Sequence, residues 1–143
     1  IREDVLEHGG AVYNHALYFP SLAPARSTKP AAALTGAIDR CFGSMEDFLR
    51  SLRRISLADK REGYTWLLSD KCGRLRLLFT LGQATALPLT PVLCLDLYRH
   101  AYELTCGDDR AAYMEAVMPL INWDALSRRY GAVFAGQPPF PNP

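Results

Sequence analysis

The sequence lacks a long hydrophobic run, a strong net charge and closely spaced cysteines. No apolar stretch among its residues approaches the roughly 20 needed to span a bilayer, so we expect no membrane partner. A formal net charge of +1 excludes a strongly polyanion-seeking protein on bulk grounds, but it does not exclude a local basic face. The four cysteines show no C-x-x-C spacing, which is typical of reduced intracellular thiols: Cys41, Cys72, Cys94 and Cys106.

The chain also lacks an initiator methionine, a secretory signal and the motifs of several enzyme classes. It begins at Ile1, inside an expected helix, so we expect a processed or trimmed N-terminus. A P-loop, a dinucleotide fingerprint and a Ser/His/Asp arrangement all lack supporting sequence. Histidine is scarce as well, with residues at positions 8, 15 and 100 only. Any histidine-based site is therefore confined to these three positions.

Helical patterns occupy the first part of the chain. Apolar spacing near 3.6 predicts a helix over residues 2–18, and Gly9-Gly10 within it indicates close approach of another backbone. The spacing predicts a second helix over residues 34–42, which ends at Gly43. Ser44 then has the character of an N-cap and opens a third helix.

The composition then changes, and the following residues are rich in β-branched and aromatic types. It predicts strands over 64–68, 75–81 and 92–95, the first two joined by a short turn and therefore antiparallel. A helix is predicted over 108–121. The order of helices, three strands and helix indicates an α+β fold with an antiparallel sheet.

We divide the chain into three parts. Residues 1–19 are interpreted as the remnant of an N-terminal helical domain, and residues 20–130 as an α+β domain. Residues 131–143 are rich in proline and glycine and are predicted to form an extended tail.

Asp96 and His100 lie four residues apart near the end of the third strand, and His15 lies on the first helix. Two imidazoles and a carboxylate are suitable ligands for manganese, iron or zinc. A histidine on a helix is more often a hydrogen-bonded core residue, and a single D-x-x-x-H spacing is common by chance. The flanking residues decide between these interpretations.

The chain resembles the iron/manganese superoxide dismutase family from end to end. The matching segments are Tyr13-Asn14-His15-Ala16-Leu17-Tyr18-Phe19, Phe42-Gly43-Ser44 with Phe48, Gly63-Tyr64-Thr65-Trp66-Leu67, Asp96 to Tyr102, Tyr113 and Asn122-Trp123-Asp124. The resemblance implies the C-terminal domain of that family, with a three-stranded antiparallel sheet flanked by helices and a truncated N-terminal hairpin.

The resemblance also implies roles for individual residues. His15, Asp96 and His100 fall at three of the family's four metal-ligand positions. Gln83 falls where the manganese-type enzymes hold the glutamine that hydrogen-bonds the metal-bound solvent. Tyr64 and Tyr98 replace tryptophans that line the family's active site, so they are candidate remnants of its surroundings.

Several departures from the family point the other way. The hairpin that carries the fourth ligand, a histidine, is absent from the sequence, and His8 lies about 10 Å along the helix axis from His15. Arg99 stands where the family has glutamate and would discourage a nearby cation. Glu103 replaces a tyrosine, and it can pair with Arg99 or with another subunit.

On these grounds we expect a non-catalytic structural subunit with no cofactor. The resemblance implies a degenerate relative in the mitochondrial ribosome small subunit, pairing with a related subunit through Arg99 and Glu103 and contacting neighbouring ribosomal proteins. Candidate contacts to rRNA are basic side chains: Arg50, Arg53, Arg54, Lys60, Arg61, Arg128 and Arg129. Their alternative interpretation is an ordinary solvated helix face.

Two other functions stay open. The main alternative is an active iron or manganese superoxide dismutase whose N-terminal segment lies outside this sequence. It would convert two superoxide ions into oxygen and hydrogen peroxide. The other is a metal protein with three ligands and different chemistry.

Overall fold

The computed structural model describes residues 2–136. Its elements are α1 (Arg2–Tyr18), the 3-10 turn η1 (Phe19–Ser21), α2 (Ala32–Phe42), α3 (Met45–Ala58), β1 (Gly63–Ser69), β2 (Leu75–Leu81), β3 (Thr90–Asp96), the 3-10 turn η2 (Arg99–Ala101), α4 (Glu103–Cys106), α5 (Arg110–Val117), the 3-10 turn η3 (Met118–Leu120) and α6 (Trp123–Ala135). The fold is α+β, as predicted. In the described part of the chain, no helix is both long and apolar enough to cross a membrane.

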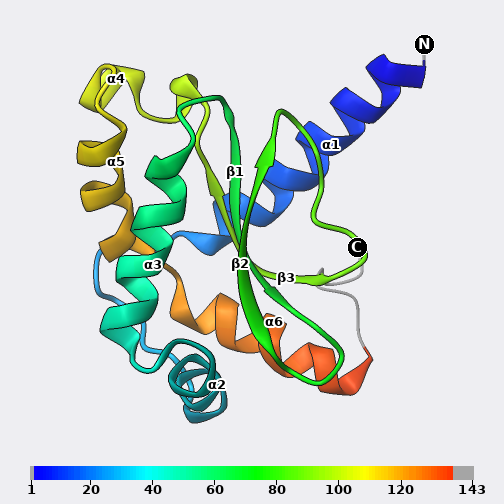
Figure 1. The fold of residues 1–143 in the computed structure, drawn as a ribbon, viewed down its shortest axis with the longest axis vertical. Helices are drawn as coiled ribbons and strands as arrows, with labels where there is room; N and C mark the ends of the chain where they lie inside the picture. Colours follow the sequence, from blue (N-terminus) through cyan, green and yellow to red (C-terminus); the bar gives the residue numbers. More distant parts are fainter. Residues whose placement is uncertain (1, 137–143) are drawn as a thin grey trace.

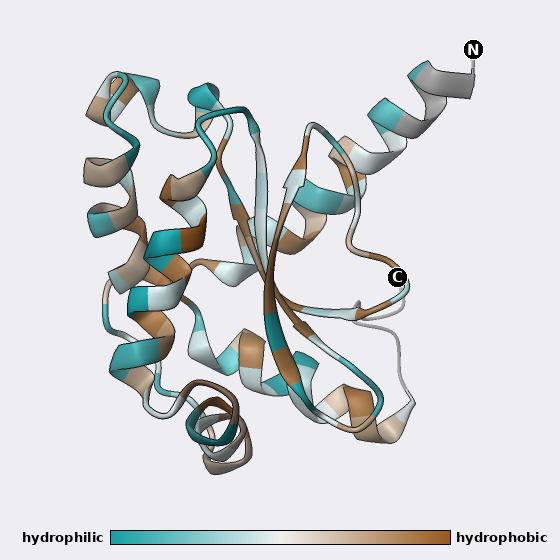
Figure 2. Ribbon diagram, viewed as in Figure 1, coloured by the Kyte–Doolittle hydropathy of each residue, from teal (hydrophilic) through white to brown (hydrophobic). Residues whose placement is uncertain are grey.

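A three-stranded antiparallel sheet forms the centre of the fold. The strand order is β2-β1-β3, so β1 pairs with both neighbours; Trp66 lies opposite Leu78 on one side and Cys94 on the other. Every residue of β1 is buried. Hydrophobic residues are prominent in the strands at the centre of the fold (Figure 2). A strand buried on both faces needs apolar side chains at successive positions, and Trp66-Leu67-Leu68 supplies them.

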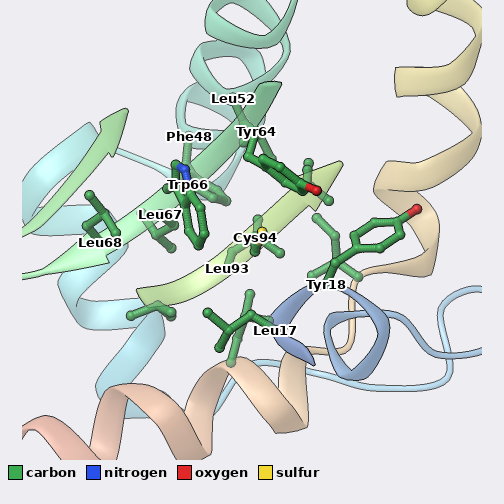
Figure 3. Packing of buried hydrophobic residues seen from close by; sticks show 14 of the residues in the cluster. Leu17, Tyr18, Phe48, Leu52, Tyr64, Trp66, Leu67, Leu68, Leu93 and Cys94 are labelled. Carbon is green, nitrogen blue, oxygen red and sulfur yellow. The ribbon is translucent and has the colours of Figure 1, made fainter. Parts of the chain in front are cut away.

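Helices cover the sheet from two sides. Phe48 and Leu52 of α3 approach the strands from one side, and Leu17 of α1 approaches from the other (Figure 3). All three side chains are fully buried. The N-terminal part of α1 extends away from the sheet (Figure 1), while its C-terminal part packs against β3. This packing brings the end of α1 to the end of β3.

Local signals explain where the helices begin and end. Gly43, with a φ of 96°, ends α2, and its N–H donates to the Asp39 carbonyl. Ser44 caps α3 because its Oγ accepts a hydrogen bond of 3.0 Å from the Asp47 N–H. Both features confirm the predicted boundary.

The C-terminal part differs from the prediction. The helix expected over 108–121 ends at Val117 and continues as the turn η3, in which Pro119 has no N–H to donate. Residues 131–135 are helical and not extended, because they continue α6. Asn122 caps the start of that helix, because its side chain accepts from the Ala125 N–H, and Leu126 of the helix is buried in the core. The rest of the predicted tail, residues 137–143, lies outside the described residues.

Two arginines connect separate elements through backbone carbonyls. Arg129 of α6 donates to Leu17 O at 3.0 Å, to Val92 O at 3.1 Å and to Ser21 Oγ at 2.7 Å. Arg110 of α5 donates to the carbonyls of Asp59, Lys60, Arg61 and Leu97. The first network ties α6 to α1 and β3; the second ties α5 to the loop after α3 and to the residue after β3.

Candidate functional site

Three side chains predicted as ligands converge beside the end of β3. Asp96 is the last residue of that strand, His15 lies near the end of α1 and His100 lies in η2. The Nε2 atoms of both histidines lie 3.0 Å from the same oxygen, Asp96 Oδ2. One ligand atom of each residue falls within 4.8 Å of the others. The end of β3 therefore brings together Asp96, a histidine that is 81 positions away in the chain and a histidine that is 4 positions away.

The carboxylate is buried and firmly held, whereas the imidazoles reach solvent. The side chain of Asp96 is 2% exposed, that of His15 32% and that of His100 54%. Asp96 Oδ1 accepts from the Tyr98 N–H at 2.9 Å, and its backbone carbonyl accepts from the Tyr113 hydroxyl at 2.8 Å. A group approaching from solvent would meet the imidazoles first, with the carboxylate behind them.

Donor chemistry and spacing fit a transition metal. Imidazole nitrogen and carboxylate oxygen are the ligands that manganese, iron and zinc accept. Two atoms bound to one ion at about 2.1 Å and at right angles are about 3 Å apart, close to the 3.0 Å between Oδ2 and each Nε2. His8 is not part of this cluster; it is exposed, and its Nδ1 lies 2.7 Å from the Asp4 carbonyl.

Gln83 lies beside the cluster, as the resemblance implies. Its Oε1 accepts a hydrogen bond of 3.0 Å from the Tyr64 hydroxyl, which is also 3.4 Å from His15 Nε2. Burial, with a smaller effect from the charge of Asp96, raises the pKa of the Tyr64 phenol. The phenol therefore stays protonated, and its O–H donates a hydrogen bond to Gln83 Oε1.

The backbone around Gln83 is irregular but fixed by contacts with α1. Asn14 Nδ2 donates to the carbonyls of Gln83 and Ala84, at 3.3 and 3.5 Å. Gly10 packs so closely on this loop that a Cβ there would overlap the Gln83 carbonyl oxygen. The close approach predicted at Gly9-Gly10 is thus confirmed for Gly10, whereas a Cβ at Gly9 would meet nothing within 4 Å. The helix that carries His15 also places Gln83.

Aromatic rings surround the histidines. Tyr98 stacks on His100 with ring centroids 5.3 Å apart, and Tyr64 meets His15 edge-on at 6.1 Å. Phe19, 65% exposed, lies 5.8 Å from the His15 ring. These contacts limit how far each imidazole can turn.

Several contributors to the site were not predicted from the sequence. Asn14 and Tyr113 matched the family pattern, but their hydrogen bonds to the loop and to Asp96 were not foreseen. A usable signal was present for Asn14, because it is a polar residue beside His15 in an otherwise apolar part of the helix. The hydrogen bond from Tyr64 to Gln83 joins a strand to a loop and has no signature in the sequence.

The charge of Arg99 is balanced within the chain. Its guanidinium lies 3.0 Å from Asp108 Oδ1 and 3.6 Å from Glu103 Oε2, and its side chain is 61% exposed. Two carboxylates and solvent weaken its field at the cluster. The expected repulsion between Arg99 and a nearby cation is therefore reduced by Asp108, whose charge the local sequence around Arg99 does not reveal. The role of Arg99 and Glu103 at a subunit interface stays a prediction.

The basic residues proposed to contact RNA have different surroundings. Arg129 is buried at 7% exposure and its guanidinium is bonded inside the protein, so it cannot present that group to an external phosphate. Arg50, Arg53 and Arg61 form ion pairs with acidic residues of this chain. The remaining candidates are exposed: Arg54, Lys60 and Arg128.

Comparison with known proteins identifies the family. Residues 30–129 match the family described as iron/manganese superoxide dismutases, C-terminal domain. The chain is 34% identical to a manganese superoxide dismutase of Listeria ivanovii, over 92% of this chain and 66% of the relative. It is 31% identical to one from Leptolyngbya boryana, over 91% and 54%, and 30% identical to an iron superoxide dismutase of Escherichia coli, over 90% and 67%.

These relatives correct the function expected from the sequence. Their names are those of manganese or iron enzymes, whereas the expectation was a non-catalytic ribosomal subunit without a cofactor; these relatives show that expectation to be wrong. The charge of Arg99, which is paired with Asp108 and Glu103, is no evidence against a metal site. The chain spans between 54% and 67% of the length of these relatives. With its family match, its sheet and its three converging ligand positions, the chain belongs to the iron/manganese superoxide dismutase family.

Proposed function

We propose that the protein is a metal-dependent superoxide dismutase, to which this chain contributes three metal ligands: His15, Asp96 and His100. The observation that carries this proposal is the convergence of their donor atoms within 4.8 Å. The reaction consumes two superoxide ions and two protons and releases one oxygen and one hydrogen peroxide. A bound manganese or iron would supply the one-electron couple that this reaction needs.

The residues of the chain have distinct tasks in this function. Asp96 is buried and held through Oδ1 and its carbonyl, so it fixes the position of the shared oxygen Oδ2. His15 and His100 complete the set from two other elements and leave one side open to solvent. Gln83 offers an amide beside the cluster, where a hydrogen-bonding group tunes a metal's potential. The family resemblance places the fourth ligand in a hairpin ahead of these residues.

We favour manganese as the metal. Gln83 occupies the position that the resemblance assigns to the glutamine of manganese-type enzymes, and its side chain does lie at the cluster. Two of the three relatives described above are named as manganese enzymes. Pairing with a related subunit and a mitochondrial location stay predictions.

The test is metal analysis combined with a superoxide assay on protein of full native length, produced with manganese and, separately, with iron. We expect close to one metal ion per chain and catalytic removal of superoxide. Asp96→Asn keeps the shape of the side chain but removes its charge, and we expect metal content and activity each to fall more than about tenfold. Asp39→Asn, which removes an exposed carboxylate of α2 outside the cluster, is the control and should retain both. Protein that takes up neither metal would refute the proposal.

A further inference from the structure

Strand β2 lies at one edge of the sheet, and half of its backbone groups point away from β1. Successive residues of an antiparallel strand direct their N–H and C=O groups alternately to the two sides. The Gly82 N–H donates to the Glu62 carbonyl, in the direction of β1, so the even-numbered residues of β2 face β1 and the odd-numbered residues face outward. The Leu75 N–H agrees with this assignment, since it donates outward to Cys41 Sγ of α2 at 3.3 Å.

The open stretch of this edge is short and is bounded at both ends. At one end the outward N–H of Leu75 is bonded to α2, and at the other the Leu81 carbonyl accepts from a loop N–H at 3.3 Å. Between them lie the outward N–H and C=O groups of Leu77 and Phe79. Within residues 2–136 these groups have no hydrogen-bond partner.

The opposite edge of the sheet is protected against pairing, whereas β2 is not. β3 carries Pro91 and a register shift, and it packs against α1 and α6. β2 pairs with β1 without a shift, contains no proline and has a single charged residue, Arg76. Two of its apolar side chains reach solvent: Leu78 is 40% exposed and Leu81 43%. An open apolar edge without such protection is a template for another strand.

We propose that β2 is a self-association surface, on which β2 of a second copy pairs antiparallel about a two-fold axis at Leu78. This axis sets Leu77 opposite Phe79 of the second copy, and each such pair exchanges both of its N–H···O bonds. The open groups then bond to one another and no occupied group is needed. The two Leu78 side chains face each other across the axis and lose their contact with water.

Charge and area both bear on a second copy as the occupant of this edge. The axis places Arg76 opposite Thr80 of the second copy, and the two Arg76 residues stand about 13 Å apart along the strands, beyond the Debye length of about 8 Å at physiological salt. No like charges of the two strands therefore meet. A pairing this short buries less than the roughly 1,200 Å² of a stable complex, so we expect a reversible association that depends on concentration.

The test is amide hydrogen exchange of β2, measured by NMR in protein of full native length over about a hundredfold range of concentration. We expect the amides of Leu77 and Phe79 to exchange fast in dilute protein and at least about fivefold more slowly in concentrated protein. The amides of Leu78 and Thr80 face β1 and are the internal control, which should change less than about twofold. Since this readout concerns β2 alone, contacts made by other surfaces do not affect it.

Two lysine variants test the position of the axis. Leu78→Lys sets two ammonium groups against each other and should abolish the slowing of the outward amides. Leu81→Lys is the matched control, because Leu81 is similarly exposed in the same strand but stands about 20 Å from its copy; it should retain the slowing. Equal effects of the two lysines would overturn the proposed pairing. Outward amides that exchange at the same rate at every concentration in the wild type would overturn it without any variant.

Discussion

Two adjacent glycines of α1 have opposite surroundings. Gly10 is buried against the Gln83 carbonyl, and Gly9 is exposed with open space where a side chain would begin. We expect Gly10→Ala to lower the free energy of unfolding by about 1–3 kcal/mol, since the loop must move to make room. Gly9→Ala should instead raise it by about 0.5–1 kcal/mol through helix propensity. Urea denaturation of both variants checks this, and equal effects at the two positions would contradict the packing seen at Gly10.

Asp59 shows how a local ion pair makes stability depend on pH. The side chain and the N–H of Arg61 hold the pKa of the Asp59 carboxyl at about 2, below its ordinary value of 3.8. Because the folded pKa is the lower one, this contribution is present above about pH 4 and is lost as the pH falls toward 2. We expect Arg61→Gln to raise the pKa of Asp59 toward its ordinary value in an NMR titration. Arg40→Gln, in helix α2, should not.

At this scale the sequence predicted three side chains that the structure brings together, but not the charges around them. His15, Asp96 and His100 were identified because their flanking residues match a family pattern. The pairing of Arg99 with Asp108 depends on how the chain folds back before α5, which no local spacing indicates. The same holds for Arg129, whose three acceptors lie on η1, β3 and α1.

Among the elements, α6 depends on one buried cation for its attachment to the sheet. Burial lowers the pKa of Arg129, yet its guanidinium supplies donors to Leu17 O, Val92 O and Ser21 Oγ. We expect Arg129→Met to cost about 3 kcal/mol of unfolding free energy, because these acceptors lose a charged donor. The neighbouring Arg128 is exposed, and Arg128→Met should stay within about 0.5 kcal/mol. Similar losses of unfolding free energy in the two variants would show that the hydrogen bonds of Arg129 are not what attaches α6 to the sheet.

Elements with strong local signals were predictable, and those set by tertiary contacts were not. The boundary between α2 and α3 follows from Gly43 and Ser44, and the sheet follows from three apolar segments and a short turn. The C-terminal part of α6 was missed because Gly131 and the following prolines suggested an extended tail. The buried first part of α6, which packs Leu126 and Tyr130 into the core, stabilises the helix and outweighs the cost of one glycine further along it. The loop that carries Gln83 has no hydrophobic periodicity that would predict its shape. Its position depends on Asn14, which lies far away in the sequence on α1.

For the whole molecule, metal binding and folding stability should be linked. A ligand that binds only the folded state at a hundred times its Kd adds about 2.7 kcal/mol of stability. For a domain of this size, we expect manganese at that concentration to raise Tm by about 5–10 °C. Differential scanning calorimetry of the full native-length protein, with and without manganese, measures the shift. His100→Gln should reduce it strongly, and an identical shift in that variant would place the ion elsewhere.

The contact between α1 and the loop after β2 also bears on how this protein can be recombined with its relatives. Gly10 and Asn14 belong to the same helix as His15, while the carbonyls they contact belong to Gln83 and Ala84. In a chimera with a relative, replacing only α1 or only the loop after β2 would bring together a helix and a loop that do not match. The mismatch would displace the glutamine. The two segments form one module, to be transplanted together or left in place.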